Sequence, residues 1–333
     1  MKSKMHTLAY ALLAVAALWP AVSNAQAPAA APEAAPASEK AAPAAPAAEA
    51  AEYSKKGADT CFSCHDDEKM TAIFHTAHGQ PTDARSPFGK GQLQCEACHG
   101  PGGNHTKRVK KGEQRPPVIR YSRDSQTPVA VQNGMCLACH EKSLAAGWHA
   151  GPHDANKVSC AACHDSHVVK DPVQSARTQA EVCYTCHVAQ RGEFQKPYAH
   201  PVPEGKVACS DCHQPHGTPN EAQLVKATVN QTCYQCHAEK RGPFLWEHAP
   251  VAEDCANCHA PHGSTSRGML TARGPLLCQS CHSQQGHPSL AYGPSGLPGG
   301  TGPLVSTLAL GNCMNCHSQV HGSNHPSGAS LTR

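Results

Sequence analysis

Ten copies of the five-residue motif Cys-x-x-Cys-His recur along this 333-residue chain. The first is Cys61-Phe62-Ser63-Cys64-His65, and the last ends at His317. Two thiols at this spacing, followed at once by an imidazole, form the attachment motif of c-type haem: each thiol bonds one vinyl group and the histidine ligates the iron. All 20 cysteines belong to these motifs: Cys61, Cys64, Cys95, Cys98, Cys136, Cys139, Cys160, Cys163, Cys183, Cys186, Cys209, Cys212, Cys233, Cys236, Cys255, Cys258, Cys278, Cys281, Cys313 and Cys316.

Each motif histidine is predicted to be the proximal ligand of one haem iron, which gives ten covalently bound haems. Disulfide pairing is a poorer interpretation, because it does not require a histidine after every second cysteine. Zinc knuckles use similar gaps, but they pair half-sites and do not need a histidine at that position each time. The proximal ligands are His65, His99, His140, His164, His187, His213, His237, His259, His282 and His317.

Histidines outside the motifs define a module repeated five times: a motif, a free histidine, a second motif and another free histidine. The gap is 13 residues from His65 to His78, but only three from His164 to His167. A histidine so close is not expected to fold back onto the same iron, so we expect short-gap histidines to bind a neighbouring haem. The predicted distal ligands are His78, His105, His153, His167, His200, His216, His248, His262, His287 and His321.

Three free histidines of the chain after its leader are in excess of this count. His75 and His149 are interpreted as solvent-exposed, because a better-placed histidine lies in the same gap. His325 remains an alternative to His321 for one iron.

Histidine ligation on both faces would leave no iron with an open position. Such saturated irons favour electron transfer over O₂ binding or catalysis, and they have lower reduction potentials than irons with a methionine ligand. Methionine is the rival ligand, but the supply of histidines suffices. The candidate sulfurs are Met70, Met135, Met269 and Met314.

The N-terminus predicts the compartment in which these haems are attached. Lys2 and Lys4 precede a short apolar run, residues 8–18, and small residues lead to Ala25. This pattern is typical of a Sec signal peptide over residues 1–25. A retained membrane anchor is the alternative, although the run is short for a hydrocarbon core of about 30 Å. A bacterial periplasm is the predicted location.

Residues 26–52 are mostly Ala, Pro and Glu, and recurrent prolines prevent a helix from propagating. They predict a disordered tether, with a helical spacer as the less favoured alternative. Two pentahaem lobes are expected after it, over residues 53–207 and 208–333.

Composition indicates that the haems themselves form the core. Aromatic residues are 5% of the chain, which also contains 27 Gly and 28 Pro. Such a polypeptide buries too little apolar area to offset its conformational entropy, so the protein without haem should be largely unfolded. The expected fold class is a haem-cored cytochrome, mostly irregular with short helices and little or no sheet. Residues 220–238 have the composition most favourable to a helix.

The formal charge of +3 excludes little by itself. Without Lys2 and Lys4 the polypeptide is nearly neutral, whereas ten haems with ionised propionates add roughly −10 when oxidised and −20 when reduced. The mature holoprotein should be acidic, so we do not predict nucleic-acid binding.

Several stretches that include non-ligand residues resemble a known family. The chain is similar to the MtrA-type decahaem cytochromes, periplasmic electron carriers of outer-membrane porin–cytochrome conduits with relatives in iron oxidation and dimethyl sulfoxide respiration. The resemblance spans residues 55–333. It is carried by KKGADTC at Cys61, LQCEACHGP at Cys95, HVVKDPV from His167, CSDCHQPHG at Cys209, CYQCHAEKRGPFLWEHAPV from Cys233 and NCHSQVHGSNHPSG from Asn315.

This resemblance implies an elongated decahaem wire of two pentahaem lobes in series, with every iron bound by two histidines at the positions given above. It also implies three kinds of partner: a β-barrel porin, an outer-surface multihaem cytochrome and a periplasmic or inner-membrane cytochrome. Electrons would hop from haem to haem between periplasm and cell exterior within a metal-reducing or metal-oxidising respiratory pathway. The alternatives are a soluble periplasmic shuttle or storage cytochrome and a multihaem reductase with an open haem. The tether departs from the family pattern.

Overall fold

The protein is described here by a computed structural model that covers residues 52–122, 125–143, 146–282 and 313–332. By its contacts the chain divides into two units, residues 1–49 and 50–333, of which the first lies wholly outside the described part. The predicted signal peptide, most of the predicted tether and His287 are therefore outside the described residues.

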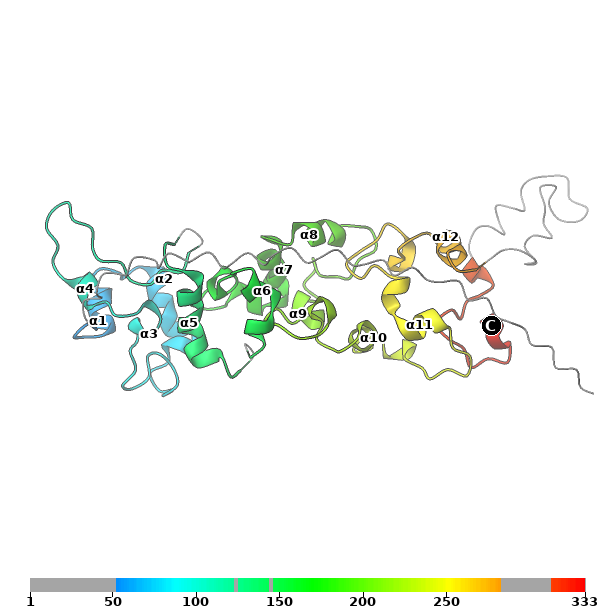
Figure 1. Cartoon of the computed structure of the whole chain (residues 1–333), viewed down its shortest axis with the longest axis horizontal. Helices are drawn as coiled ribbons and strands as arrows, with labels where there is room; N and C mark the ends of the chain where they lie inside the picture. The colour runs from blue at the N-terminus through cyan, green and yellow to red at the C-terminus, as the bar shows by residue number, and fades with distance from the viewer. Residues whose placement is uncertain (1–51, 123–124, 144–145, 283–312, 333) are drawn as a thin grey trace, which may run out of the picture. The chain divides into compact units, whose positions relative to one another are not determined.

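The second unit is built from short helical segments joined by irregular chain, and the helices follow one another in chain order (Figure 1). The α-helices are α1 Ala58–Phe62, α2 Glu68–Thr71, α3 Glu96–His99, α4 Gly103–Thr106, α5 Val129–His140, α6 Pro152–Ala155, α7 Ala176–Tyr184, α8 Val188–Phe194, α9 Cys209–Cys212, α10 Val229–Cys233, α11 Ala249–Glu253 and α12 Gly274–Gln279. The 3-10 turns are η1 Ala72–His75, η2 Ala77–Gly79, η3 Trp148–Ala150, η4 Cys160–Ala162, η5 Pro172–Gln174, η6 Glu221–Gln223, η7 Ala238–Lys240, η8 Cys255–Asn257, η9 Arg267–Met269, η11 Cys313–Asn315 and η12 Gly328–Ser330.

Extended pairing within the described ranges is limited to isolated bridges. Examples are the antiparallel bridges Tyr198 to Ser264 and Trp246 to Ser323, each of which joins segments far apart in sequence. The predicted fold class, mostly irregular with short helices and little or no sheet, is confirmed. The predicted division into two pentahaem lobes stays a prediction.

Each Cys-x-x-Cys-His motif forms a single helical turn. In the first motif the amide of His65 donates to the carbonyl of Cys61 at 3.0 Å, and in the sixth the amide of His213 donates to Cys209 at 2.9 Å. Residues spaced i, i+3 and i+4 share one side of a helix. The turn therefore presents both thiols and the imidazole in the same direction.

The two motifs of a module end up in different local structures. The odd-numbered motifs begin within a helix, as Cys136 does in α5 and Cys183 does in α7. The even-numbered motifs begin a short turn of their own, as Cys160 does at η4 and Cys209 does at α9.

Buried amide side chains tie the second motif of a module to the first. Asn133 in α5 donates to the carbonyl of Val158 at 3.1 Å and accepts from the amide of Cys160 at 2.8 Å. Asn230 in α10 repeats this arrangement by accepting from the amide of Cys255 at 2.7 Å. Asn133 and Asn230 are 4% and 7% exposed, so these bonds are shielded from competing water.

The side-chain amide of Gln179 makes a similar contact with the second motif of the third module. Gln179 in α7 accepts from the amide of Ser210 at 2.9 Å and donates to the Ser210 hydroxyl at 3.0 Å. These bonds cross residue 207, where the first predicted lobe ends.

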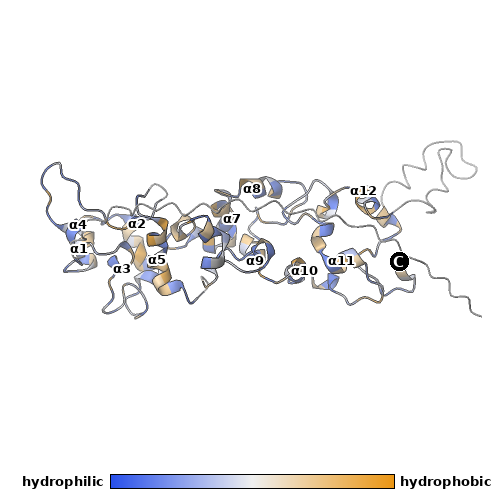
Figure 2. Cartoon of the chain, viewed as in Figure 1, coloured by the Kyte–Doolittle hydropathy of each residue, from blue (hydrophilic) through white to orange (hydrophobic). Residues whose placement is uncertain are grey.

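Apolar burial by the polypeptide alone is slight. Ala180, Tyr184 and Val202 form a small buried cluster, and no described side chain is fully buried. Figure 2 shows hydrophobic and hydrophilic residues mixed along the helices. The described part of the chain thus holds no conventional hydrophobic core.

Residues 220–238 do not form the continuous helix that their composition favours. The α-helix α10 covers only Val229–Cys233, and Leu224 instead pairs with His213 in an isolated bridge. Ala222 takes a left-handed conformation with φ 48°, and its carbonyl lies 2.8 Å from Nδ1 of His213. Contact with a motif histidine therefore outweighs local helix propensity here.

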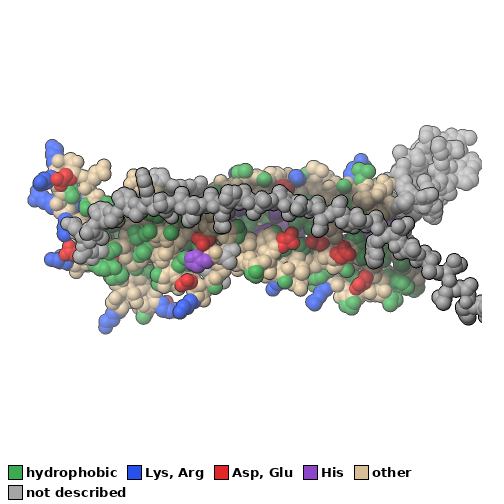
Figure 3. Space-filling view, viewed as in Figure 1, with side chains coloured by type: hydrophobic (Ala, Val, Ile, Leu, Met, Phe, Trp, Pro, Cys, Tyr) green, Lys and Arg blue, Asp and Glu red, His purple; other side chains and the backbone are tan. Residues whose placement is uncertain are grey.

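Basic side chains gather in the segment between α4 and α5. Arg115 donates to the carbonyls of His105 and Lys107, both at 2.9 Å, which fixes the base of this loop beside a predicted ligand. Figure 3 shows Lys and Arg side chains concentrated near α1 and α4 on the face in view. The cations of the segment among the described residues are Lys107, Arg108, Lys110, Lys111, Arg115 and Arg120.

Candidate haem sites

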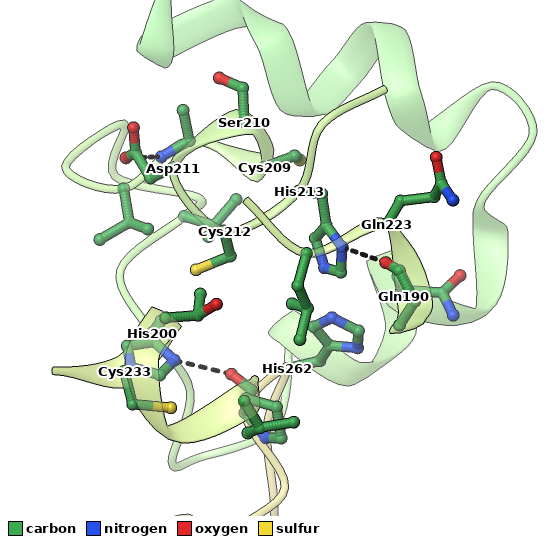
Figure 4. A pocket seen from close by; sticks show the side chains of 18 of the residues that line it. Gln190, His200, Cys209, Ser210, Asp211, Cys212, His213, Gln223, Cys233 and His262 are labelled. Carbon is green, nitrogen blue, oxygen red and sulfur yellow. Dashed lines mark hydrogen bonds between the residues drawn. The ribbon is translucent and has the colours of Figure 1, made fainter. Parts of the chain in front are cut away.

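Side chains of nine of the ten motifs, the second to the tenth, line a continuous cavity of about 3490 Å³. Its lining runs from Cys98 of the second motif to Cys316 of the tenth. This volume is several times the roughly 300–1,000 Å³ of an ordinary small-molecule site. Figure 4 shows one part of it, where the rings of His213 and His262 lie near one another beside Cys209 and Cys212.

Nine of the ten motif histidines face one predicted distal histidine each. The distances between ring centroids fall between 5.9 and 6.5 Å. The pairs are His65–His105 (6.5 Å), His140–His78 (6.0 Å), His99–His167 (6.2 Å), His187–His153 (6.2 Å), His164–His216 (5.9 Å), His237–His200 (6.3 Å), His213–His262 (6.0 Å), His282–His248 (6.1 Å) and His259–His321 (6.1 Å).

This separation fits an iron held between two imidazoles. Metal–nitrogen bonds of about 2 Å on each side bring the ring centroids to about 6 Å apart. A zinc site would instead need four ligands around one ion. Within the described residues, no three His, Cys, Asp or Glu side chains form such a metal-binding group, whereas imidazoles meet two at a time.

Eight of the nine pairs join histidines of neighbouring modules, and His65–His105 lies within the first module. His167 lies three residues past His164 but faces His99 of the preceding module at 6.2 Å. His78 lies in the first module and faces His140 of the second at 6.0 Å. Spacing predicts such exchange for the short-gap histidines only, but the long-gap histidines do the same in the opposite direction.

Hydrogen bonds at Nδ1 orient most of these rings. His99 contacts the carbonyl of Ile119 at 2.8 Å, and His200 contacts that of Pro261 at 2.7 Å. A ring whose Nδ1–H donates to a carbonyl has Nε2 left for a metal. The same contact with a backbone carbonyl is made by His105, His153, His213, His248, His259 and His317.

Two rings have a carboxylate within hydrogen-bond distance of Nδ1 instead, and a third, His237, has Glu239 farther away at 3.9 Å. His164 lies 2.7 Å from Oδ2 of Asp171, and His262 lies 3.1 Å from Oε2 of Glu193. Sequence reasoning does not single out either acid, because nothing in their spacing marks them as partners of a ligand.

Burial lowers the pKa of several of the paired imidazoles. Desolvation is the main cause for His78, His99, His216 and His321, and a neighbouring histidine adds to it in each case. A lowered pKa favours the neutral ring, which is the form that ligates metals.

The first thiols of the two motifs in a module interact with one another. A hydrogen bond between Cys61 and Cys95 lowers the pKa of Cys61 to about 7 and raises that of Cys95. The same thiol contact recurs in the other four modules, between Cys136 and Cys160, Cys183 and Cys209, Cys233 and Cys255, and Cys278 and Cys313.

Thiols of neighbouring modules also influence one another electrostatically. Burial raises the pKa of Cys98 to about 11, and the nearby thiols of Cys136 and Cys139 contribute to the rise. Burial likewise raises the pKa of the Cys258 thiol, and the nearby thiol of Cys281 contributes to the rise. At these two module boundaries, motif thiols of adjacent modules are therefore close enough to interact electrostatically.

The surplus histidines take other positions. His149 is exposed and contacts Asp154 at 3.1 Å, and the ring of His325 accepts from the amide of Ser327 at 3.1 Å. It is His321 and not His325 that faces His259. His287, the remaining predicted distal ligand, lies outside the described residues.

Comparisons with known proteins agree with the motif analysis. A family profile described as a doubled CXXCH motif matches residues 200–242 and 248–287. A second, described as cytochrome c-type protein NrfB-like, matches residues 95–180.

Curated relatives extend the similarity to most of the chain. This chain is 45% identical over 283 residues to multiheme cytochrome MtrA of Shewanella baltica, and the alignment covers 84% of this chain and 83% of the relative. This chain is also 34% identical over 140 residues to cytochrome c-type protein NrfB of Escherichia coli O6:H1, and that alignment covers 39% of this chain and 65% of the relative.

No helix in the described ranges has the length and apolarity to cross a bilayer.

Proposed function

The chain belongs to the MtrA-type multihaem c-type cytochromes, which transfer electrons rather than catalyse reactions, and we propose that it is the decahaem wire of an outer-membrane porin–cytochrome conduit. The observation that carries this proposal is the row of paired imidazoles. Each described pair has the spacing of an iron with two histidine ligands, and the pairs link every module to the next. The proposed cofactor set is ten haems c, each with two histidine ligands.

The physical reason for a row of haems is distance. A hydrocarbon core of about 30 Å is too wide for one tunnelling step at a useful rate, and closely spaced haems divide that distance into short hops. Contact between the first thiols of Cys61 and Cys95, and of their counterparts in other modules, supports close spacing of successive haems. The chain supplies the saturated ligand sets and holds the haems in sequence, and the bound haems supply the redox chemistry.

The proposed location and partners follow from this role. The predicted leader would export the chain to the periplasm. A holoprotein made acidic by haem propionates cannot face lipid, so a β-barrel porin would enclose it. A periplasmic or inner-membrane cytochrome would exchange electrons at one end and an outer-surface multihaem cytochrome at the other.

Spin state separates this proposal from the reductase alternative. The oxidised, mature protein should contain ten haems by pyridine haemochrome and show only low-spin iron by electron paramagnetic resonance. A stoichiometric high-spin signal would identify an open iron and favour a reductase instead.

Reconstitution separates the proposal from the soluble shuttle. We expect the cytochrome to co-purify with a β-barrel porin from outer membranes. Vesicles that contain the complex should reduce an entrapped viologen dye when dithionite is added outside. Vesicles with the porin alone are the matched control and should not. Absence of both co-purification and transmembrane reduction would support the shuttle.

A further inference from the structure

Among the histidines of the even-numbered motifs, His164 is the one whose Nδ1 lies next to a carboxylate. Its Nδ1 lies 2.7 Å from Oδ2 of Asp171, whereas His99, His213 and His259 contact backbone carbonyls at 2.8 Å. A carbonyl carries a partial charge, but an ionised carboxylate carries a full one. The histidine of the fourth motif therefore has a full negative charge next to its Nδ1, whereas these three have a carbonyl dipole there.

Asp171 is held in place by more than this one contact. Its side chain accepts from the amide of Val173 at 3.3 Å and so caps the turn η5, Pro172–Gln174. Oδ2 also accepts from the side-chain amide of Gln174 at 3.3 Å. The carboxylate side chain is only 11% exposed, so water screens it weakly. Within the described residues its ion-pair partner is His164 and not a lysine or arginine.

We propose that Asp171 is a positioning residue that strengthens His164 as a ligand and lowers the reduction potential of the haem held between His164 and His216. A carboxylate that accepts from Nδ1–H makes the imidazole a stronger electron donor. Its negative charge also stabilises the ferric iron, which carries one more positive charge than the ferrous iron. This inference rests on the two-histidine ligation proposed above.

The second carboxylate partner provides an internal comparison. Glu193 lies 3.1 Å from His262, but its side chain is 39% exposed and Lys196 lies 3.9 Å from its other oxygen. A longer contact, more solvent and a nearby cation all weaken its effect on the ligand. The haem between His213 and His262 should therefore be affected less.

The test is a redox titration of the full-length holoprotein with Asp171→Asn. Asparagine keeps an oxygen that can accept from Nδ1 but removes the charge. We expect one tenth of the haem absorbance change to move to a higher potential, by about a tenfold change in the ratio of oxidised to reduced haem, or about 59 mV. The haem should remain low-spin by electron paramagnetic resonance.

Two further variants make the test specific. Asp154→Asn is the control, because Asp154 accepts from Nε1 of Trp148 at 3.0 Å and contacts His149 at 3.1 Å but forms no hydrogen bond with a described iron ligand, and asparagine keeps an oxygen that can accept from Trp148. It should shift the potential much less than Asp171→Asn, and Glu193→Gln should give a shift between the two. If Asp171→Asn loses haem, Asp171→Ser carries the same test with a water as acceptor.

The outcomes distinguish this inference from the proposed function. Ten low-spin haems with unchanged potentials in the Asp171 variant, or an equal shift in the Asp154 control, would overturn the inference and leave the ligation proposal standing. A high-spin haem in the unmodified protein would overturn the ligation proposal itself.

Discussion

At the scale of the residue, imidazoles from distant parts of the chain come together in pairs. His259 and His321 lie 62 positions apart, yet their rings lie 6.1 Å apart and nearly parallel at 11°. His248 helps to fix this region, since its Nδ1 contacts the carbonyl of Val320 at 3.0 Å. The ring of His325 is turned to the amide of Ser327.

This geometry predicts opposite results for two neighbouring substitutions. His321→Ala should remove one ligand from the haem at His259 and convert one haem in ten to high spin, measured by electron paramagnetic resonance of the oxidised protein. His325→Ala is the matched control and should leave the spectrum low-spin. High spin in the His325 variant alone would reverse the assignment.

At the scale of the element, the helices that carry the motifs are short. A motif needs a single turn to direct two thiols and an imidazole to one side. In α5, α7 and α10 the helix also carries a side-chain amide that bonds to the next motif, and we call this contact the amide clamp. Asn230 in α10 both donates to the carbonyls of Val251 and Ala252 and accepts from the amide of Cys255. The clamp joins the two haem sites of a module through polypeptide alone.

Removal of this clamp should destabilise its module. Asn230→Ala leaves the half-buried amide of Cys255 and the carbonyl of Val251 without a side-chain partner, which costs about 1–3 kcal/mol of the free energy of unfolding. The measurement is the guanidinium unfolding midpoint of the holoprotein. Asn156→Ala is the control, because Asn156 is exposed and bonds only to the carbonyl of Pro152, and its midpoint should hardly move. Equal midpoints for both variants would contradict the role of the clamp.

At the scale of the whole molecule, the described polypeptide surrounds a cavity rather than a core. Buried apolar residues are few among the described residues, and Trp148 and Tyr184 are the large ones. Motif thiols and paired imidazoles line the 3490 Å³ cavity. The apolar surface that drives folding must therefore come from the porphyrins.

Haem attachment should accordingly decide whether the chain folds. Chain produced in a host without c-type cytochrome maturation should show little helical signal by far-ultraviolet circular dichroism and rapid proteolysis, because entropy is not offset by burial. The haem-loaded protein is the control and should resist the protease. A protease-resistant, haem-free chain would show that the polypeptide builds its own core.

Sequence by itself determined the cofactor chemistry and the fold class. Attachment is a local event, since five consecutive residues hold both thiols and the proximal imidazole, so each site is readable without the fold. The count of free histidines likewise indicates a ligand supply sufficient for every iron. Few aromatics and many glycines and prolines indicate a chain with short helices.

Only the tertiary structure decided which groups meet. The gap of three residues already argues against His164 as the partner of His167, but only the structure shows that the ring of His167 faces His99. Residues 220–228 leave a helical path so that the carbonyl of Ala222 can reach His213. Asp171 acquires its role from a 2.7 Å contact that no spacing rule contains. Such pairings depend on the sum of many weak, long-range contacts, whereas the motifs depend on covalent neighbours alone.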